Sequence, residues 1–215
     1  MKVDFHLHSP ASILNGDSIN WSNTPDVIRK LWNNKVGAFA FTDHNVFDSK
    51  LFLEAKSICK NNIFVFPGVE INIVKADGVI AHLILLFNRE LDDSKIIQLE
   101  KMCKDNLRKR GIKIDAVNEI FKDYEYIAIP HVGKGDFFKV DELDFDHVAI
   151  ETTSEKNANY KRWIKHLNNK SIVAFSDTHI WKDYPQNEEL TTHIDFDGSF
   201  KDLKEKLTLN KSYIN

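Results

Sequence analysis

Two histidines separated by one residue, His6 and His8, stand near the start of the chain, and Asp4 precedes them. Side chains alternate along an extended strand, so a strand over residues 2–7 would place the acid and both imidazoles on one face. Two imidazoles placed in this way can bind one metal ion, and a carboxylate behind them can accept an N–H and fix the tautomer of a ring. The motif by itself is equally consistent with ordinary surface histidines.

Residues of the same kinds recur beside other apolar runs. They come at or just after the predicted end of a strand, or on a hairpin strand, and comprise Asp43, His44, Glu70, His82, His131, Glu151, Asp177 and His179. Each has an ordinary explanation, such as helix capping by His44 or pairing of Glu70 with a lysine. Six of the nine histidines are involved, however, and one shared cause explains this better than six coincidences. We therefore expect a polynuclear metal site.

The elements that must position these residues follow from the hydrophobic pattern. Short β-rich runs predict strands at residues 2–7, 37–42, 63–66, 69–73, 79–87, 126–131, 147–150, 171–175 and 193–196. Amphipathic stretches predict helices at residues 24–34, 48–60, 93–108, 113–121, 156–168 and 199–207. Pro67-Gly68 is expected to break the third strand, Asp77-Gly78 to turn a hairpin, and the polar stretch 9–23 to form an active-site loop.

The alternation of strands and helices predicts an α/β fold built from parallel βα units, either a wound sheet or a barrel. In both architectures, ligands bind at the carboxyl ends of the strands. The expected metal site lies at that end.

Composition limits the alternatives. A chain of 215 residues with 42% hydrophobic residues can bury one full core, so we expect a single domain over residues 1–215. We find no basic-then-apolar leader and no run near the ~20 apolar residues that span a bilayer, which predicts a soluble, cytoplasmic protein without a membrane partner. Cys59 and Cys103 are the only cysteines and fall in predicted helices, so neither a disulfide framework nor a thiolate zinc site is expected.

The charge balance argues against a globally basic surface of the kind that holds nucleic acid by neutralising phosphates, because the net charge is -3 and the pI is about 6.3. One local basic cluster contains Lys101, Lys104, Arg108, Lys109, Arg110 and Lys113. The simpler interpretation of this cluster is a solvated helix end, and the alternative is a contact with a phosphate backbone.

The ordered set of motifs resembles the PHP family, the polymerase and histidinol phosphatase domains. The matching segments are Asp4-Phe5-His6-Leu7-His8, Thr42-Asp43-His44-Asn45, Gly68-Val69-Glu70, His82, Pro130-His131 and Ser176-Asp177-Thr178-His179. The match runs from residue 3 to about residue 180. The resemblance implies a distorted (β/α)7 barrel, a TIM-like fold that agrees with the alternation of elements.

The resemblance also implies two to three divalent metal ions and their ligands. His6, His8, Glu70 and Asp177 would hold the first ion and form the catalytic set, while His82 and His131 would hold a second ion that Glu70 bridges to the first. His44 and His179 would hold the third, for which the family usually supplies one more ligand, His or Asp, from the loop after the first strand. That position is Asn15 here, with Asp17 as the substitute if the loop shifts.

Imidazole and carboxylate ligands without a thiolate suit Zn, Mn or Fe. Two cations that share Glu70 would lower the pKa of a bridging water and generate hydroxide for attack on a phosphate ester. Asp4 and Asp43 are expected to orient the ligands, and Glu151 to orient them or to support the barrel end. Candidate phosphate contacts are Lys134, Lys139 and Arg162.

These arguments predict a metal-dependent phosphoesterase whose substrates are phosphodiesters of nucleic acid or nucleotides, that is, a nuclease-type hydrolase. The enzymatic alternative is a phosphomonoesterase of the histidinol-phosphatase kind, and C–N bond hydrolysis would need a bridging lysine that the sequence does not identify. The non-enzymatic alternative is a metal-stabilised interaction module. The segment 193–204 resembles the one that follows PHP domains before SMC-like or AAA-like ATPases, so a separate ATPase chain or domain is an expected partner.

Overall fold

The computed structural model describes residues 1–60, 62–132, 137–139, 142–152, 171–185 and 191–214. The strands are β1 (Lys2–Leu7), β2 (Val36–Phe41), β3 (Phe64–Val74), β4 (Ile80–Phe87), β5 (Tyr126–Pro130), β6 (Ala149–Glu151), β7 (Ser171–Val173), β8 (Thr192–Ile194) and β9 (Ser212–Ile214). The helices are α1 (Thr24–Asn33), α2 (Ser49–Cys59), α3 (Asp93–Asn106), α4 (Ile114–Ile120) and α6 (Phe200–Thr208), with 3-10 helices η1 (Pro10–Asn15) and η3 (Trp181–Asp183).

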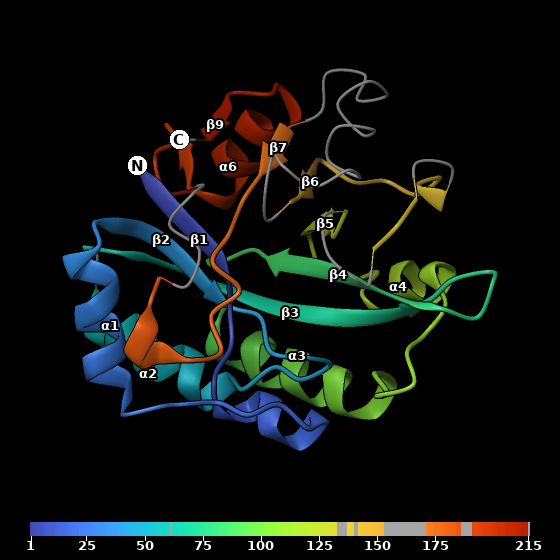
Figure 1. Ribbon diagram of the computed structural model, residues 1–215, viewed down its shortest axis with the longest axis horizontal. Coiled ribbons are helices and arrows are strands. Elements are labelled where there is room, and N and C mark those ends of the chain that lie inside the picture. Colours follow the sequence, from blue (N-terminus) through green and yellow to red (C-terminus); the bar gives the residue numbers. More distant parts are fainter. Residues whose placement is uncertain (61, 133–136, 140–141, 153–170, 186–190, 215) are drawn as a thin grey trace.

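A curled, seven-stranded mixed sheet forms the centre of the molecule, in the order β5-β4-β3-β2-β1-β8-β9 (Figure 1). Strands β1, β2 and β3 are parallel, whereas β4 runs antiparallel to both β3 and β5. A second parallel pair, β6 and β7, lies between the ends of the curl. Single bridges join His131 to Glu151 and Leu7 to Thr178, which link β6 to the end of β5 and the segment after β7 to β1. The predicted α/β class is confirmed.

Helices cover the outer face of the sheet, and a second core fills its concave face. Figure 1 shows α1, α2 and α3 together on one side of the sheet and α6 on the other. The outer cluster includes Leu31 of α1, Phe52 of α2 and Leu99 of α3. The inner cluster packs Phe200 and Leu203 of α6 against side chains from the strands: Val3, Phe5, Ala38, Ala40, Phe66, Ile84, Leu86, Ile127 and Ile129. Helix α6 therefore seals the concave face.

The first strand departs from the expected alternation. Val3 and Phe5 pack in the inner cluster, but Leu7 packs in the outer one. The cause is an irregularity in the pairing with β2, where Asp4 pairs with Phe39 and Leu7 with Phe41, so that one extra residue of β1 is accommodated. Such a bulge re-aims side chains. His6 and His8 point to the same place, as predicted, because both lie beside Glu70 and Asp177. The prediction was wrong for Asp4, which contacts Ser176 and Tyr184 instead.

The third strand is also longer than predicted, because Pro67-Gly68 does not break it. Pro67 is the last residue of β3 that pairs with β2, and pairing with β4 begins at Gly68. The missing N–H of proline is therefore placed where one ladder ends and the other starts. Gly68 permits a close approach, since a Cβ there would lie 2.7 Å from Thr42 Cγ2.

The hairpin at Asp77-Gly78 is confirmed, and it makes β4 antiparallel to β3. The start of β4 consequently lies at the same end of the sheet as the carboxyl end of β3. Strand β9 was not predicted, and the helix predicted at residues 156–168 lies outside the described part of the chain. None of the described helices is both long enough and apolar enough to span a bilayer.

Candidate metal centre

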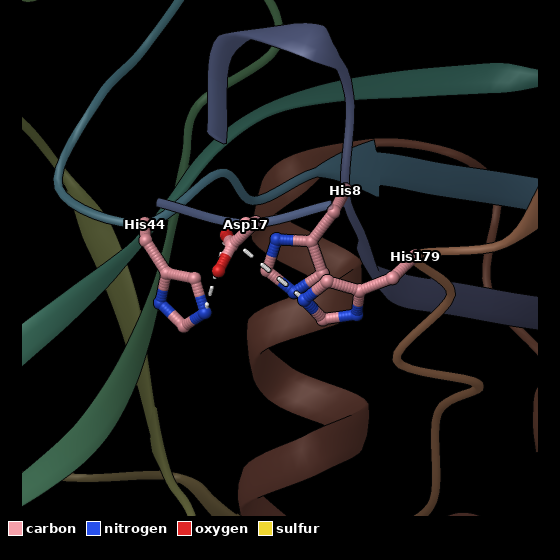
Figure 2. Close-up of side chains that lie close together, drawn as sticks. All are labelled: His8, Asp17, His44 and His179. Carbon is pink, nitrogen blue, oxygen red and sulfur yellow. Dashed lines mark ion pairs between the residues drawn. The ribbon is translucent and has the colours of Figure 1, made fainter. Parts of the chain in front are cut away.

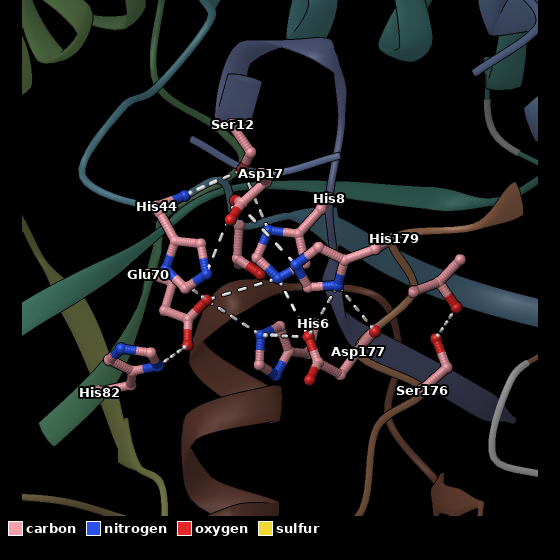
Figure 3. Close-up of polar contacts among 12 residues, drawn as sticks. His6, His8, Ser12, Asp17, His44, Glu70, His82, Ser176, Asp177 and His179 are labelled. Carbon is pink, nitrogen blue, oxygen red and sulfur yellow. Dashed lines mark hydrogen bonds and ion pairs between the residues drawn. The ribbon is translucent and has the colours of Figure 1, made fainter. Parts of the chain in front are cut away.

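Four potential ligand atoms converge at the carboxyl ends of β1 and β3 (Figure 3). His6 Nε2 lies 3.1 Å from Glu70 Oε2 and 3.2 Å from Asp177 Oδ1. His8 Nε2 lies 3.4 Å and 3.1 Å from the same two oxygens. Four ligands bound tetrahedrally at about 2.0–2.1 Å would be separated by roughly 3.3 Å. The four imidazole–carboxylate distances are close to this value, and His6, His8 and Asp177 together could hold an ion.

A second group forms around the other oxygen of Glu70. His82 Nδ1 lies 2.9 Å and His131 Nε2 lies 3.5 Å from Glu70 Oε1. His131 follows the end of β5, while His82 stands near the start of β4. His82 reaches the same end of the sheet only because the hairpin reverses β4. The two oxygens of Glu70 thus face two different sets of imidazoles.

A third group is more open and comes from loops (Figure 2). Asp17 Oδ2 lies 3.7 Å from His44 Nε2 and 4.0 Å from His179 Nε2. The ring of His8 lies close to this group, and the four residues together could hold an ion. The side chains of Asp17, His44 and His179 are 15% to 29% exposed, so this group faces solvent.

The loop after β1 decides between the two candidates for the third site. The side-chain amide of Asn15 donates to the backbone carbonyl of His44 at 2.5 Å, so it ties the loop to the chain after β2. Asp17, two residues later, directs its carboxylate between the two histidines. Gly16, between these two residues, has a φ of 103°, in the left-handed region that favours glycine. This backbone turn lets Asn15 and Asp17 point to different partners. The geometry favours Asp17 over Asn15 at the third site.

Glu151 orients the ring of His6 from behind, and it also contacts the nitrogen of His131 that faces Glu70. Its carboxylate lies 2.9 Å from His6 Nδ1 and 2.5 Å from His131 Nε2. A carboxylate that accepts the Nδ1–H of His6 leaves the lone pair of His6 Nε2 directed at Glu70 and Asp177. The sequence offered this role to Asp4 and, as one of two options, to Glu151, and the geometry at the end of β6 favours Glu151.

Asp4 instead holds the segment that carries Asp177. Its carboxylate accepts the backbone N–H of Ser176 at 3.2 Å and the hydroxyl of Tyr184 at 3.0 Å. Asp177 has a φ of 50°, a left-handed conformation that costs free energy outside glycine and asparagine-like residues. The contacts of Asp4 fix the backbone beside this strained residue, and the bulge in β1 turns Asp4 toward it.

Asp43 acts on His8 through a serine. Its carboxylate accepts hydrogen bonds from the hydroxyls of Ser9 at 2.6 Å and of Ser12 at 2.8 Å. Since the Ser12 hydroxyl donates to Asp43, its oxygen accepts from His8 Nδ1, 3.1 Å away. That tautomer leaves the lone pair of His8 Nε2 facing the centre. Asp43 was predicted to orient ligands, and this geometry shows a path for that effect.

Sequence reasoning missed three residues that position the centre: Ser12, Trp181 and Tyr184. Trp181 donates its indole N–H to the backbone carbonyl of His8 at 2.8 Å, and Tyr184 stacks on Trp181. Ser12 lies four residues after His8, a spacing that could have been noticed. Nothing in the sequence around Trp181 or Tyr184 distinguishes them from ordinary core aromatics.

The charges of the centre depend on each other. Burial disfavours the protonated form of His6, but the charges of Glu151 and Glu70 outweigh it and raise the pKa of His6 to about 9. Burial lowers the pKa of His8 well below its ordinary value. Burial also opposes ionisation of Glu70 and Glu151, yet the surrounding imidazoles hold the pKa values of both carboxyls below their ordinary range. In the metal-free protein, one buried imidazolium balances part of the carboxylate charge.

The polar atoms of the centre are close together but are poorly aligned for hydrogen bonding. Within the described residues, Asp17 Oδ2, His44 Nδ1, Glu70 Oε1 and His131 Nε2 are buried and make no hydrogen bond. His44 Nδ1 nevertheless lies 3.1 Å from Glu70 Oε2. Buried polar atoms that face one another without a hydrogen bond are typical of a site that an ion or a water molecule completes. The residues therefore fit divalent metal ions.

The other candidates from the sequence lie elsewhere. Lys139 faces Asp77 Oδ2 at 3.8 Å and Glu142 Oε1 at 3.7 Å, near the hairpin, and Lys134 and Arg162 lie outside the described residues. Cys59 and Cys103 are buried helix residues, as predicted. Burial raises the pKa of the Cys59 thiol to about 11 and also raises that of Cys103.

Comparisons with known proteins reveal the fold. No protein-family model and no curated protein sequence matches the chain. Among solved structures, the lesion-specific endonuclease PfuEndoQ from Pyrococcus furiosus is similar with 14% identity and a TM-score of 0.64, over 99% of this chain and 57% of that one. The chain thus spans little more than half the length of that endonuclease.

Two further structures cover most of their own length. An amidohydrolase from Chromobacterium violaceum has 12% identity and a TM-score of 0.58, over 84% of this chain and 88% of that one. An inferred metal-dependent phosphoesterase from Bifidobacterium adolescentis has 12% identity and a TM-score of 0.56, over 82% of this chain and 87% of that one. At these identities, the likeness establishes a shared fold and no more.

Proposed function

We propose that the chain is a metal-dependent phosphoesterase of the PHP type that hydrolyses phosphodiesters of nucleic acid or nucleotides. The observation that carries this proposal is the convergence of His6, His8, Glu70 and Asp177 at the spacing of a tetrahedral metal site. The printed names of two structures with the same fold, an endonuclease and an inferred phosphoesterase, support the reaction class.

The proposal includes the finer fold and the ligand assignment. Strands β1 to β7 would close as a distorted (β/α)7 barrel through the bridges that link β6 and β7 to their neighbours. His6, His8, Glu70 and Asp177 hold the first ion, and Glu70, His82 and His131 hold the second. Asp17, His44 and His179 hold the third, with Asp17 in the place expected for Asn15. Zn, Mn and Fe suit this donor set equally.

Each part of the centre has a distinct task. Bound divalent ions would supply an activated water and neutralise phosphoryl oxygens. Glu151 and Ser12 fix which nitrogens of His6 and His8 face the centre. The buried side excludes solvent because His6, His8, Glu70 and His131 are at most 2% exposed. The ester enters from the side of His44, His82 and His179, whose side chains are 15% to 29% exposed.

The test combines metal analysis with two esters. Purified protein should contain divalent metal and hydrolyse bis(p-nitrophenyl) phosphate faster than p-nitrophenyl phosphate. His8→Ala and Asp177→Ala should each lose metal and activity, whereas His193→Ala should retain both, because His193 stacks on Tyr213 away from the centre. Full activity in the first two variants would refute the proposal.

The ester pair also separates the alternatives. A preference for p-nitrophenyl phosphate would favour a monoesterase of the histidinol-phosphatase kind. Metallated protein that cleaves neither ester would favour C–N bond hydrolysis or a non-catalytic interaction module. The amidohydrolase of the same fold makes an amide panel worth including, although no described lysine pairs with Glu70. The ATPase partner stays a prediction.

A further inference from the structure

The part of the basic cluster that follows α3 contacts β3 and the loop after β1. We define the basic segment as residues 108–113, which contain four cations and no acid in a protein of net charge -3. The chain between α3 and α4 passes the end of β3 (Figure 1), where Ile112 bridges Ile73. Glu70, which enters the centre, lies earlier in the same strand.

Backbone contacts fix this position. Asn72 donates its side-chain amide to the carbonyl of Lys109 at 2.9 Å and accepts the N–H of Ile112 at 2.9 Å. Asn72 is also the residue of β3 that pairs with His82, and its N–H is bound by Asn45, next to His44. Gly111 lets the two chains meet, because a Cβ there would lie 2.9 Å from the carbonyl oxygen of Asn72.

The side chain of Lys109 reaches the loop of the third metal group. A Cβ on Gly16 would lie 3.0 Å from Lys109 Nζ, so the ammonium group packs over the residue between Asn15 and Asp17. This contact places a cation at the loop of the third group, against the residue that precedes Asp17.

The remaining cations of the segment differ in how they are used. The guanidinium of Arg108 donates to the backbone carbonyls of Lys104, Asp105 and Leu107, so it caps α3. Lys109, Arg110 and Lys113 are exposed, and no carboxylate within the described residues pairs with them. Lys109 lies at the loop of the third group, and Arg110 and Lys113 lie close to it in the chain. Exposed cations without acidic partners attract phosphates.

We propose that Lys109, Arg110 and Lys113 bind the backbone phosphates that flank the scissile phosphodiester, so that the substrate is a nucleic acid strand rather than an isolated nucleotide or a small monoester. This inference rests on the proposed function for the location of the scissile phosphate. A metal centre neutralises the one phosphate that reacts, whereas cations outside it gain contacts only from a polymer. The contact is electrostatic and independent of base sequence.

Two charge-matched double variants test it. Lys109→Gln/Arg110→Gln removes two cations from the segment, and Lys201→Gln/Lys211→Gln removes two exposed lysines in and after α6, which covers the concave face of the sheet. The wild type and the two variants are titrated into a fluorescein-labelled, phosphorothioate-linked oligonucleotide of about 12 nucleotides, single-stranded or annealed. Binding constants are measured between about 50 and 200 mM salt. Circular dichroism checks that each variant is folded.

For the single strand, each lost phosphate contact should reduce the slope of log K against log salt by about 0.7. The segment variant should therefore show a slope about 1.4 less steep than wild type and roughly tenfold weaker binding at the lower salt, while the control keeps the wild-type slope. The ratio of kcat/KM for a hydrolysable oligonucleotide to that for bis(p-nitrophenyl) phosphate should fall in parallel.

Equal slopes for the two variants would overturn this inference while leaving the proposed function intact. Absence of ester hydrolysis by the wild type would overturn the proposed function, and the binding titration would still decide whether the segment holds phosphates. Weakened binding of an acidic protein, with an unchanged oligonucleotide slope, would assign the segment to a protein partner instead and overturn the inference.

Discussion

The metal centre has a buried half and an open half, and they are built differently. The buried half (His6, His8, Glu70, His131 and Glu151) comes from strands or residues next to them and is at most 2% exposed. The open half (Asp17, His44 and His179) comes from loops and is 15% to 29% exposed. Contacts to Asp17 in the open half are 3.7 Å and 4.0 Å long, whereas the buried half is tighter, with His6 Nε2 only 3.1 Å from Glu70.

This difference indicates which residues of the centre are held rigidly and which can move. Strands fix their side chains through the sheet, so the buried ligands are in place before any ion binds. Loop ligands can move, so the open half can adjust to an ion or to a substrate. Changes in the buried half should therefore abolish function, and changes in the open half should reduce it.

The largest effect is expected for Glu70→Gln. An uncharged amide keeps the shape but removes the charge that both oxygens present to His6 and His82. We expect loss of bound metal and a decrease in phosphodiester hydrolysis of more than about a hundredfold. This decrease is larger than the one expected when a residue that only hydrogen-bonds to a ligand is replaced. Metal content and kcat/KM are measured beside Glu142→Gln, whose acid pairs with Lys75 away from the centre. Equal metal content in both variants would show that Glu70 is not a ligand.

The second effect is a pH dependence of metal binding that arises in the buried half. The pKa of His6 is raised to about 9 in the metal-free protein, so an ion at neutral pH must displace a proton from it. Metal affinity should rise about tenfold per unit between roughly pH 7 and 9 and then level off. Calorimetric titration in buffers of different ionisation enthalpy should detect the released proton, and an enthalpy independent of the buffer would contradict this origin.

The stability of the metal-free protein should change in the opposite direction over the same range. A folded-state pKa above the ordinary value of 6.5 means that protonated His6 stabilises the fold fully below about pH 6.5. That contribution is lost as pH rises through about 9. Chemical denaturation of chelator-treated protein should thus show a falling free energy of unfolding across this window, while the metal-loaded protein does not follow it.

A smaller effect is expected in the open half. Asp17→Asn should lose the most weakly bound ion and lower kcat/KM by about tenfold, with the buried ions retained. Asn15→Asp should not create a stronger third site, because its carboxylate would replace a donor to the carbonyl of His44. Elemental analysis of both variants measures the number of ions bound per chain. A gain of metal in Asn15→Asp would contradict the proposal that Asp17 is the third-site ligand.

The smallest effect is expected for Ser12→Ala, behind His8. The variant removes the acceptor of His8 Nδ1 and the link to Asp43. We expect a loss of kcat/KM at or below about tenfold without loss of the first ion. Ser94→Ala, an exposed serine in the first turn of α3, serves as the control. A loss as large as that of Glu70→Gln would mean that the buried half is less rigid than its contacts indicate.

The sequence predicted the buried half better than the open half, for a physical reason. Glu70 and His131 follow apolar strand residues at a fixed period, so their direction toward the concave face could be derived. The bulge in β1 depends on the pairing of Asp4 and Leu7 with β2, a tertiary register that local sequence does not encode. Of the acids expected to orient ligands, Glu151 contacts the ring of His6, whereas Asp4 holds the backbone of Ser176.

The open half depends on loop geometry, which periodicity does not describe. The sequence identified both Asn15 and Asp17, but only the short bond from Asn15 to the carbonyl of His44 separates their roles. Strand β3 also could not be predicted as continuous from local sequence. Pro67 fits within it because pairing with β2 ends at Pro67 and pairing with β4 begins at Gly68, which depends on the neighbouring strands.

The β3–β4 hairpin gives the protein an insertion point. Asn72 and His82 are paired in its outer half, whereas a Cβ on Gly78 at its tip would meet no atom within 4 Å. Residues added at the tip would lengthen an arm that projects into solvent without changing the pairing of the strands below it. A peptide or small domain grafted at Gly78 would thus be carried next to the metal centre. This site would let protein engineers bring a chosen binding module beside the candidate centre while its residues stay in register.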